Sequence, residues 1–167
     1  MNREQAQYFG KYRGTVVNTT DPEQRARLRA VVPDVLGTEP TTWALPAAPY
    51  SGNAAGFVAL PPVGAGVWIE FEQGNPDYPI WSGGWWGISA ELPPNSAATG
   101  VNQITLVTPG RHAVVISDAP GTSGGVALRT STGARITVSE SGIVIDNGQG
   151  ASIALTGNTI RITGVMV

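Results

Sequence analysis

Residues 126–138 read VALRTSTGARITV, and residues 143–155 read IVIDNGQGASIAL, the same pattern moved 17 positions along the chain, from 126 to 143. A third copy opens with IRIT at residues 160–163. Within each copy, aliphatic residues alternate with small or polar ones in two short runs around a turn, which predicts two β-strands per copy. Such self-similarity indicates a repeat architecture, in which neighbouring units bury one another's apolar faces.

The aliphatic positions of these strands follow one regular spacing. They stand two residues apart within a strand and so share a face, and from strand to strand they advance by 10, 7, 10 and 7 residues. We assign them as an inward-facing core: Val126, Leu128, Ile136, Val138, Ile143, Ile145, Ile153, Leu155, Ile160 and Ile162. Upstream, Ile104/Leu106 and Val114/Ile116 keep the 10-residue step, and residues 117–125 are predicted to form a surface loop.

The strands of this repeat carry too few aliphatic side chains to form a closed hydrophobic core within one chain. Each strand offers about two aliphatic side chains, each worth about 1.5–3 kcal/mol on burial, whereas ordering each residue costs about 1.5 kcal/mol. Three copies around one axis would turn each apolar stripe into one side of a closed triangular prism and leave no strand edge open. We therefore predict a homotrimer.

The first half of the chain has a different composition. All five Trp, four Tyr and three Phe precede residue 88, and Gly (22) and Pro (13) are spread along the whole chain, which favours short strands over helices. Five strand-like runs, at 14–18, 27–32, 56–60, 66–71 and 80–84, predict a small barrel. We expect an all-β protein with a barrel at residues 1–88, a linker at 89–103 and the repeat at 104–167.

Charge and composition argue against several classes of protein. The formal net charge is −2 and charged residues make up 13% of the chain. The absence of cysteine excludes disulfides and thiol nucleophiles. Small β-barrels can bind single-stranded nucleic acid with aromatic side chains in a basic groove, and the tryptophans with Arg25, Arg27 and Arg29 keep that alternative open. However, residues 1–100 hold six Lys and Arg against nine Asp and Glu, so we expect no nucleic acid partner.

No motif of catalysis or metal binding is recognisable. His112 is the only histidine and lies outside any serine or acidic motif, so a packing or turn role is expected. Glu70 and Glu72 flank Phe71 on the outer face of one strand, where solvation or a subunit contact is expected. A polysaccharide or cell-wall hydrolase built on a β-helix remains the enzymatic alternative, although Glu140 and Asp146 are the only acids on the repeat's outer face. We predict no enzyme activity, catalytic residue, metal or cofactor.

An ordered set of residues between Tyr8 and Trp86 carries a family resemblance. The set is GKYRGTVV at 10–17, Asp21-Pro22, Arg27, Pro33, Trp43-Ala44, PYSG at 49–52, Gly56-Phe57, LPPVG at 60–64, VWIEF at 67–71, GNPDYP at 74–79 and Gly83-Gly84. It resembles the OB-fold domain of phage baseplate assembly protein V and of the valine-glycine repeat spikes of type VI and extracellular contractile injection systems. The second part resembles the same family's spike, with Gly110-Arg111-His112, Asp118 and Gly121 at its start.

The resemblance implies a fold, a function and partners. The fold is an OB-fold collar followed by an intertwined triple-stranded β-helix, and the function is that of a homotrimeric central spike that docks on a baseplate hub and pierces the target envelope. The C-terminal residues Val165, Met166 and Val167 are expected to seat a conical, PAAR-like tip protein. Assembly is expected in the cytoplasm of the producing cell, as part of a virion tail or injection particle.

Departures from the family's pattern limit what the resemblance implies. Ala26 stands where the family usually has glycine, and Asn75 where it often has aspartate. Residues 87–101 leave no room for the lysozyme domain of some relatives, and the C-terminus lacks the His-x-His motif that binds iron at some spike tips. The Trp85-Trp86 pair beside the linker is expected to pack between barrels or against a neighbouring protein.

Overall fold

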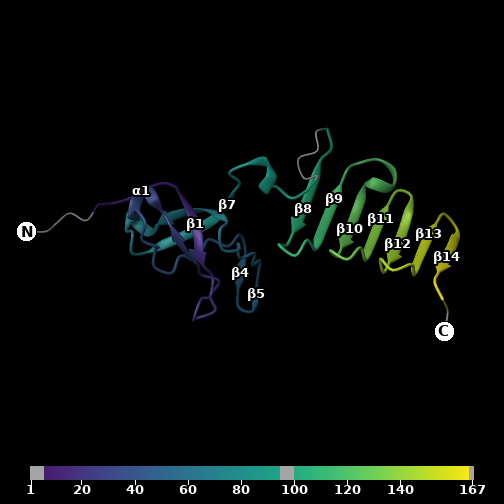
Figure 1. Ribbon diagram of the computed structural model, residues 1–167, viewed down its shortest axis with the longest axis horizontal. Coiled ribbons are helices and arrows are strands. Elements are labelled where there is room, and N and C mark those ends of the chain that lie inside the picture. The colour runs from purple at the N-terminus through teal and green to yellow at the C-terminus, as the bar shows by residue number, and fades with distance from the viewer. Residues whose placement is uncertain (1–5, 95–99, 166–167) are drawn as a thin grey trace, which may run out of the picture. The chain divides into compact units, whose positions relative to one another are not determined.

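The computed structural model describes residues 6–94 and 100–165, which belong to two compact units, Met1–Ser89 and Ala90–Val167. Strands dominate both units, and the one α-helix of the described residues, α1 (Pro33–Leu36), has four residues. Short 3-10 turns occur at Glu72–Gly74, Ser89–Glu91 and Gly121–Ser123. The predicted all-β fold class is therefore confirmed (Figure 1).

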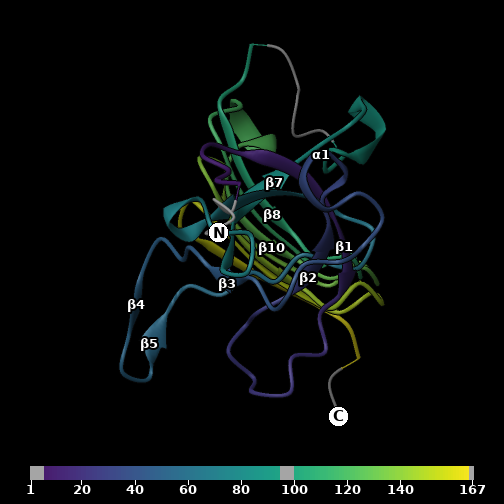
Figure 2. The same cartoon turned by 90° about the vertical axis from the view of Figure 1, so that its left-hand side faces the viewer.

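The first unit is built around a five-stranded sheet in the order β2-β1-β6-β7-β3. Its strands are β1 (Tyr12–Asn18), β2 (Arg29–Val31), β3 (Leu45–Pro46), β6 (Gly66–Phe71) and β7 (Pro79–Trp85). The neighbours pair antiparallel, except that β3 runs parallel to β7. A separate hairpin of β4 (Ser51–Gly52) and β5 (Ala55–Gly56) projects from the barrel (Figure 2).

This unit has a core of its own. On β6, every second residue is buried (Val67, Ile69 and Phe71), as the alternation in the sequence predicts. These side chains pack with buried residues of β1, β2 and the segments that follow them: Val16, Leu28, Ala30, Val32 and Ala44. Tyr8, Tyr12 and Trp81 lie against the same cluster. The barrel can therefore exclude water from its interior without a partner.

One predicted strand of the barrel is wrong. Residues 56–60 were expected to form a strand, but the structure has only the two-residue β5 there, and Phe57, Val58 and Leu60 are exposed. The following Pro61-Pro62 has no backbone N–H groups to donate to a ladder, so a strand could not continue through it.

The second unit is one seven-stranded antiparallel sheet in which each strand pairs with its neighbour in sequence. The strands, five residues each, are β8 (Gln103–Val107), β9 (Ala113–Ser117), β10 (Gly125–Arg129), β11 (Arg135–Ser139), β12 (Gly142–Asp146), β13 (Ser152–Thr156) and β14 (Thr159–Thr163). Figure 1 shows them side by side in chain order. From β10 onward, five-residue connections (130–134 and 147–151) alternate with two-residue turns (140–141 and 157–158), which accounts for the alternating spacings of 10 and 7.

Candidate functional site

The aliphatic residues of the second unit form two continuous columns on one face of its sheet. The first column is Leu106, Val114, Leu128, Ile136, Ile145, Ile153 and Ile162, and each member is the direct cross-strand partner of the next. The second is Ile104, Ile116, Val126, Val138, Ile143, Leu155 and Ile160, joined in the same way. We call these fourteen residues the aliphatic face. All ten residues predicted as trimer core belong to it.

Within the C-terminal unit, no described residue covers the aliphatic face. Its members are between 37% (Val114, Ile143 and Leu155) and 66% (Ile160) exposed, although the sheet pairs them in perfect register. A monomeric soluble protein rarely leaves a contiguous apolar surface of this size in water, because each partly exposed aliphatic side chain forgoes part of the roughly 1.5–3 kcal/mol that full burial contributes. The face therefore has the character of an interface. The burial of these side chains at a three-fold axis remains a prediction.

Glycines at the strand starts hold the ladder in register. Gly142 has φ +135°, and a Cβ at this position would lie 2.1 Å from the Leu155 carbonyl oxygen. Gly125 has φ +89°, and its Cβ would lie 2.0 Å from the Val138 carbonyl oxygen. Both positions combine a left-handed backbone with close approach of the adjacent strand, so only glycine fits without a shift. Because the side-chain period of a strand is two, a one-residue slip would turn the aliphatic side chains to the other face.

Side-chain hydrogen bonds close the connecting loops. The Thr130 hydroxyl accepts the Ala134 backbone N–H at 3.1 Å, and Asn147 Oδ1 accepts the N–H groups of Gln149 and Ala151 at 2.9 and 3.0 Å. These bonds satisfy backbone donors that the loops would otherwise leave without partners in the chain. His112 lies in the first such loop, where its backbone N–H donates to Thr108 Oγ1 at 3.2 Å. Its backbone thus serves a turn.

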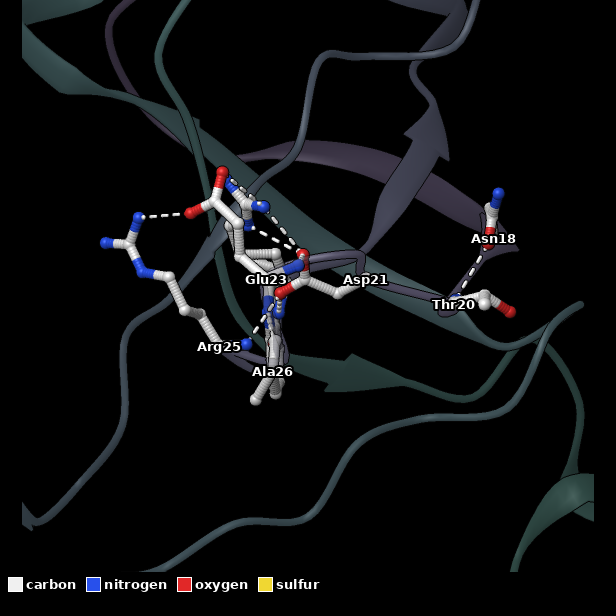
Figure 3. A network of polar contacts seen from close by, with 8 residues as sticks. Asn18, Thr20, Asp21, Glu23, Arg25 and Ala26 are labelled. Atoms are coloured by element: carbon white, nitrogen blue, oxygen red, sulfur yellow. Dashed lines mark hydrogen bonds and ion pairs between the residues drawn. The ribbon is translucent and has the colours of Figure 1, made fainter. Parts of the chain in front are cut away.

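The most densely bonded polar cluster lies in the barrel, in the loop between β1 and β2 (Figure 3). Arg27 Nη2 and Nε donate to Asp21 Oδ1 at 2.6 and 3.1 Å, and both side chains are largely buried. Asp21 also accepts the backbone N–H groups of Glu23, Arg25 and Arg27. The Arg27 guanidinium lies 5.7 Å from the Trp43 ring centroid, a cation–π distance.

Charge pairing shifts the protonation equilibria of this cluster. The hydrogen bond from Arg27, with the backbone N–H donors, holds the pKa of Asp21 far below its usual range. Arg25, and then Arg27, lower the pKa of Glu23, and Asp21 raises the pKa of Arg27. The acids and bases of the cluster satisfy one another, so the arrangement braces a loop and offers no free general acid or base.

Most of the charged residues considered from the sequence form hydrogen bonds or ion pairs within the chain. Arg29 donates to the Thr41 carbonyl oxygen at 2.8 Å, and Arg25 bonds Glu23 at 3.0 Å, so the predicted basic strand presents no free row of arginines. Lys11 pairs with Glu70 and also donates to Ser82 Oγ at 2.8 Å.

Over the described ranges, no three His, Cys, Asp or Glu residues stand close enough to hold a metal ion. No helix of those ranges is long and apolar enough to cross a membrane.

The two neighbouring tryptophans at the end of β7 behave differently. Trp85 packs on Trp68, with ring centroids 6.4 Å apart, and its Nε1 donates to the Val67 carbonyl oxygen at 3.1 Å. The Arg13 guanidinium lies 5.1 Å from the Trp85 ring centroid. Trp85 thus has partners within its own barrel, while the packing of the pair between barrels or against a neighbouring protein stays a prediction. Trp86 is 61% exposed and remains free for such a contact.

An apolar groove in the barrel was not anticipated from the sequence. It has a volume of about 460 Å³ and lies between the 46–49 segment, the 57–61 segment and residues 81–84 of β7, with Trp81 in its wall. The indole Nε1 of Trp81 donates to the Ala26 carbonyl oxygen at 3.1 Å and so fixes the ring. The unusual density of Pro and Ala at 46–49 and 59–62 is the one sequence signal for this groove.

Comparison with known families gives two matches. Residues 12–86 match the type VI secretion system/phage-baseplate injector OB domain. Residues 103–167 match the phage baseplate V C-terminal trimerisation domain, so the aliphatic face lies entirely within a region of that description. A search of curated protein sequences found no significant match.

Proposed function

The chain belongs to the phage baseplate V spike family, and from this premise we propose that three copies form the central spike of a contractile tail or injection system. This family is a structural one and not a known family of enzymes. The observation that carries the proposal is the aliphatic face, two seven-residue columns left exposed in a region matched to a trimerisation domain. Three sheets that turn these faces toward a common axis would enclose a dry interior.

The proposed role is mechanical. A closed prism of paired strands around a close-packed aliphatic interior resists bending, as a needle driven through an envelope must. The OB collar is proposed to dock on the baseplate hub, and sheath contraction would then drive the spike through the target envelope. We expect assembly in the cytoplasm of the producing cell, before the spike leaves as part of the particle.

The C-terminal end is proposed to carry the conical, PAAR-like tip protein. Val165 is 94% exposed, and β14, the last strand of the sheet, leaves one edge without a partner in the described chain. An open strand edge next to an apolar side chain is a surface that a cap would stabilise. Met166 and Val167, the other two residues assigned to this contact, lie outside the described residues.

The proposal can be tested in the strain that produces the particle. Deleting the gene should give particles that do not penetrate target cells, and restoring it should return penetration, with three copies of the chain per particle. Ile136→Asp should fail to restore penetration, whereas Thr137→Asp, on the opposite face of the same strand, should succeed. Particles that penetrate normally without the chain would contradict the proposal.

A further inference from the structure

In the C-terminal sheet, the strand ends and the loops that connect them form two rows, one on each side of the sheet, and the two rows carry opposite charge. We call these rows edges, as distinct from the edge strands β8 and β14. One edge holds the loops 108–112, 130–134 and 147–151 with the strand ends beside them, and its charged residues are Arg111, Arg129, Arg135 and Asp146. We call it the basic edge. The other holds the loop 118–124 and the turns 140–141 and 157–158, and its charged residues are Asp118 and Glu140. We call it the acidic edge.

The basic edge has more positive charge than its own chain neutralises. Arg129 and Arg135 are direct cross-strand partners, an arrangement of like charges that is unfavourable by itself. Arg135 Nη2 lies 3.1 Å from Asp146 Oδ2, whereas Arg129 makes no ion pair within the described residues. The edge therefore keeps an uncompensated cation beside the Arg135–Asp146 pair.

The acidic edge lacks a cation. Glu140 sits in the two-residue turn between Ser139 and Gly142, and its Oε2 accepts the Gly121 backbone N–H at 3.3 Å. This bond holds the carboxylate at the strand ends, next to the loop that begins with Asp118. Over residues 103–165, no Lys or Arg lies on this edge. A partner that completes it must bring positive charge at the height of Glu140.

A second copy of this chain supplies that charge. Rotation about a three-fold axis adds no shift along the axis, so the basic edge of one sheet meets the acidic edge of the next at the same strand. Arg135 begins β11 and Glu140 follows its other end, so in a prism whose strands run across the axis the two residues stand at one height on opposite edges. In the same way, Arg111 lies just before β9 and Asp118 just after it.

We propose that each corner of the prism is closed by ion pairs between protomers. Arg129 and Arg135 of one protomer face Glu140 of the next, and Arg111 faces Asp118 of the next. This inference rests on the proposed trimer and goes beyond it, because it fixes the order and axial register of the chains. The aliphatic columns alone, being uniform along the sheet, would also tolerate an assembly in which one chain is shifted by one strand and the three-fold symmetry is lost. Charged pairs at an interface select against such a shift.

Cross-linking of introduced cysteines tests the proposal, since the native chain has none. In Arg135→Cys/Glu140→Cys, the two positions lie at opposite ends of one extended strand, about 17 Å apart within a chain. A short two-carbon bismaleimide cannot span that distance, but it can join the edges of adjacent protomers. After cross-linking, we expect the denatured protein to run at the mass of three chains instead of one on a denaturing gel. The mismatched control, Arg111→Cys/Glu140→Cys, differs in height by about three strands, roughly 14 Å, and should stay single.

The outcomes separate this inference from the proposed function. The mass of each variant in solution is first measured without the cross-linking reagent, which shows whether the trimer forms. A trimer in which the matched pair does not cross-link, or cross-links no better than the mismatched pair, overturns the corner pairing and leaves the spike intact. A monomer for the unmodified protein overturns both. Charge reversal adds a readout: Glu140→Arg should lower the dissociation temperature of the trimer, and Arg135→Glu in the same chain should restore part of the loss.

Discussion

The two units of this protein bury their apolar residues by different means. In the barrel, Leu28, Val67 and Ile69 are fully buried within the chain. In the C-terminal sheet, the corresponding strand positions, such as Ile145 and Ile153, remain 40% or more exposed even though every internal strand is paired on both sides. The backbone hydrogen bonds between the strands of a sheet can thus be formed while its apolar side chains are still exposed to water. We therefore expect the first unit to fold by itself and the second to require other copies.

The largest expected effect is on assembly. Ile153→Asp would place three carboxylates around the axis, and the penalty for burying an unpaired charge is several kcal/mol for each ion. We expect this variant to stay monomeric, as measured by light scattering after size exclusion. Arg161→Asp, on the opposite face of the neighbouring strand, should still form trimers. Equal masses for the two variants would refute the assignment of the aliphatic face.

The next effect should stay within the barrel. Leu28→Ala removes a fully buried side chain and should cost about 2–5 kcal/mol of barrel stability. All five tryptophans lie between residues 43 and 86, so their fluorescence reports unfolding of the first unit alone. The denaturation midpoint seen by fluorescence should fall, while the mass of the assembly stays that of a trimer. Loss of the trimer in this variant would mean that the two units are not independent.

A smaller effect should follow from changing the ladder's backbone. Gly142→Ala forces a Cβ against the Leu155 carbonyl at a left-handed position, and we expect a loss of about 1–3 kcal/mol per chain. Gly157→Ala is the matched control, because its φ is +58° but no atom lies within 4 Å of the added Cβ. Trimer dissociation temperatures should rank the wild type above Gly157→Ala and both above Gly142→Ala. The reverse order of the two variants would show that close strand approach does not matter here.

The barrel's stability should also depend on acid pH through Asp21. Its pKa is depressed in the folded state, so its stabilising effect is complete above the unfolded value of about 3.9 and is lost as pH falls further. Urea midpoints followed by tryptophan fluorescence should drop between pH 6 and pH 3. Asp21→Asn should be less stable at pH 6 and should show a shallower acid loss than Asp34→Asn, a change at an exposed residue of α1. Identical pH profiles would contradict the role assigned to the Arg27 pair.

The smallest change is expected at Ala26. This residue adopts φ +57°, a left-handed backbone that glycine adopts at less cost than alanine. Left-handed backbone costs a residue with a Cβ about 1 kcal/mol, partly offset by the greater unfolded-state entropy of glycine. Ala26→Gly should therefore raise the fluorescence midpoint slightly. A lower midpoint would show that tertiary contacts of the Ala26 methyl outweigh the strain.

The repeat made the second unit predictable, and the barrel was harder to predict. Strict alternation and the spacings of 10 and 7 were sufficient to assign all ten core positions to one face, because the sheet is a simple meander with regular loops. The Asp21–Arg27 pair was missed because it depends on Gln24 and Ala26 adopting positive φ, which no residue pattern signals. The contacts of Trp85 within its own barrel were not predicted, because its partners, Arg13 and Trp68, come from other strands.

The mass of the purified protein in solution tests the central claim most directly. Native mass spectrometry should give about 52 kDa, three times the chain mass of 17.3 kDa, with the amides of β8 to β14 protected from hydrogen exchange. A species of 17.3 kDa whose C-terminal amides are equally protected would contradict the account, because the sheet would then be stable with its aliphatic face in water.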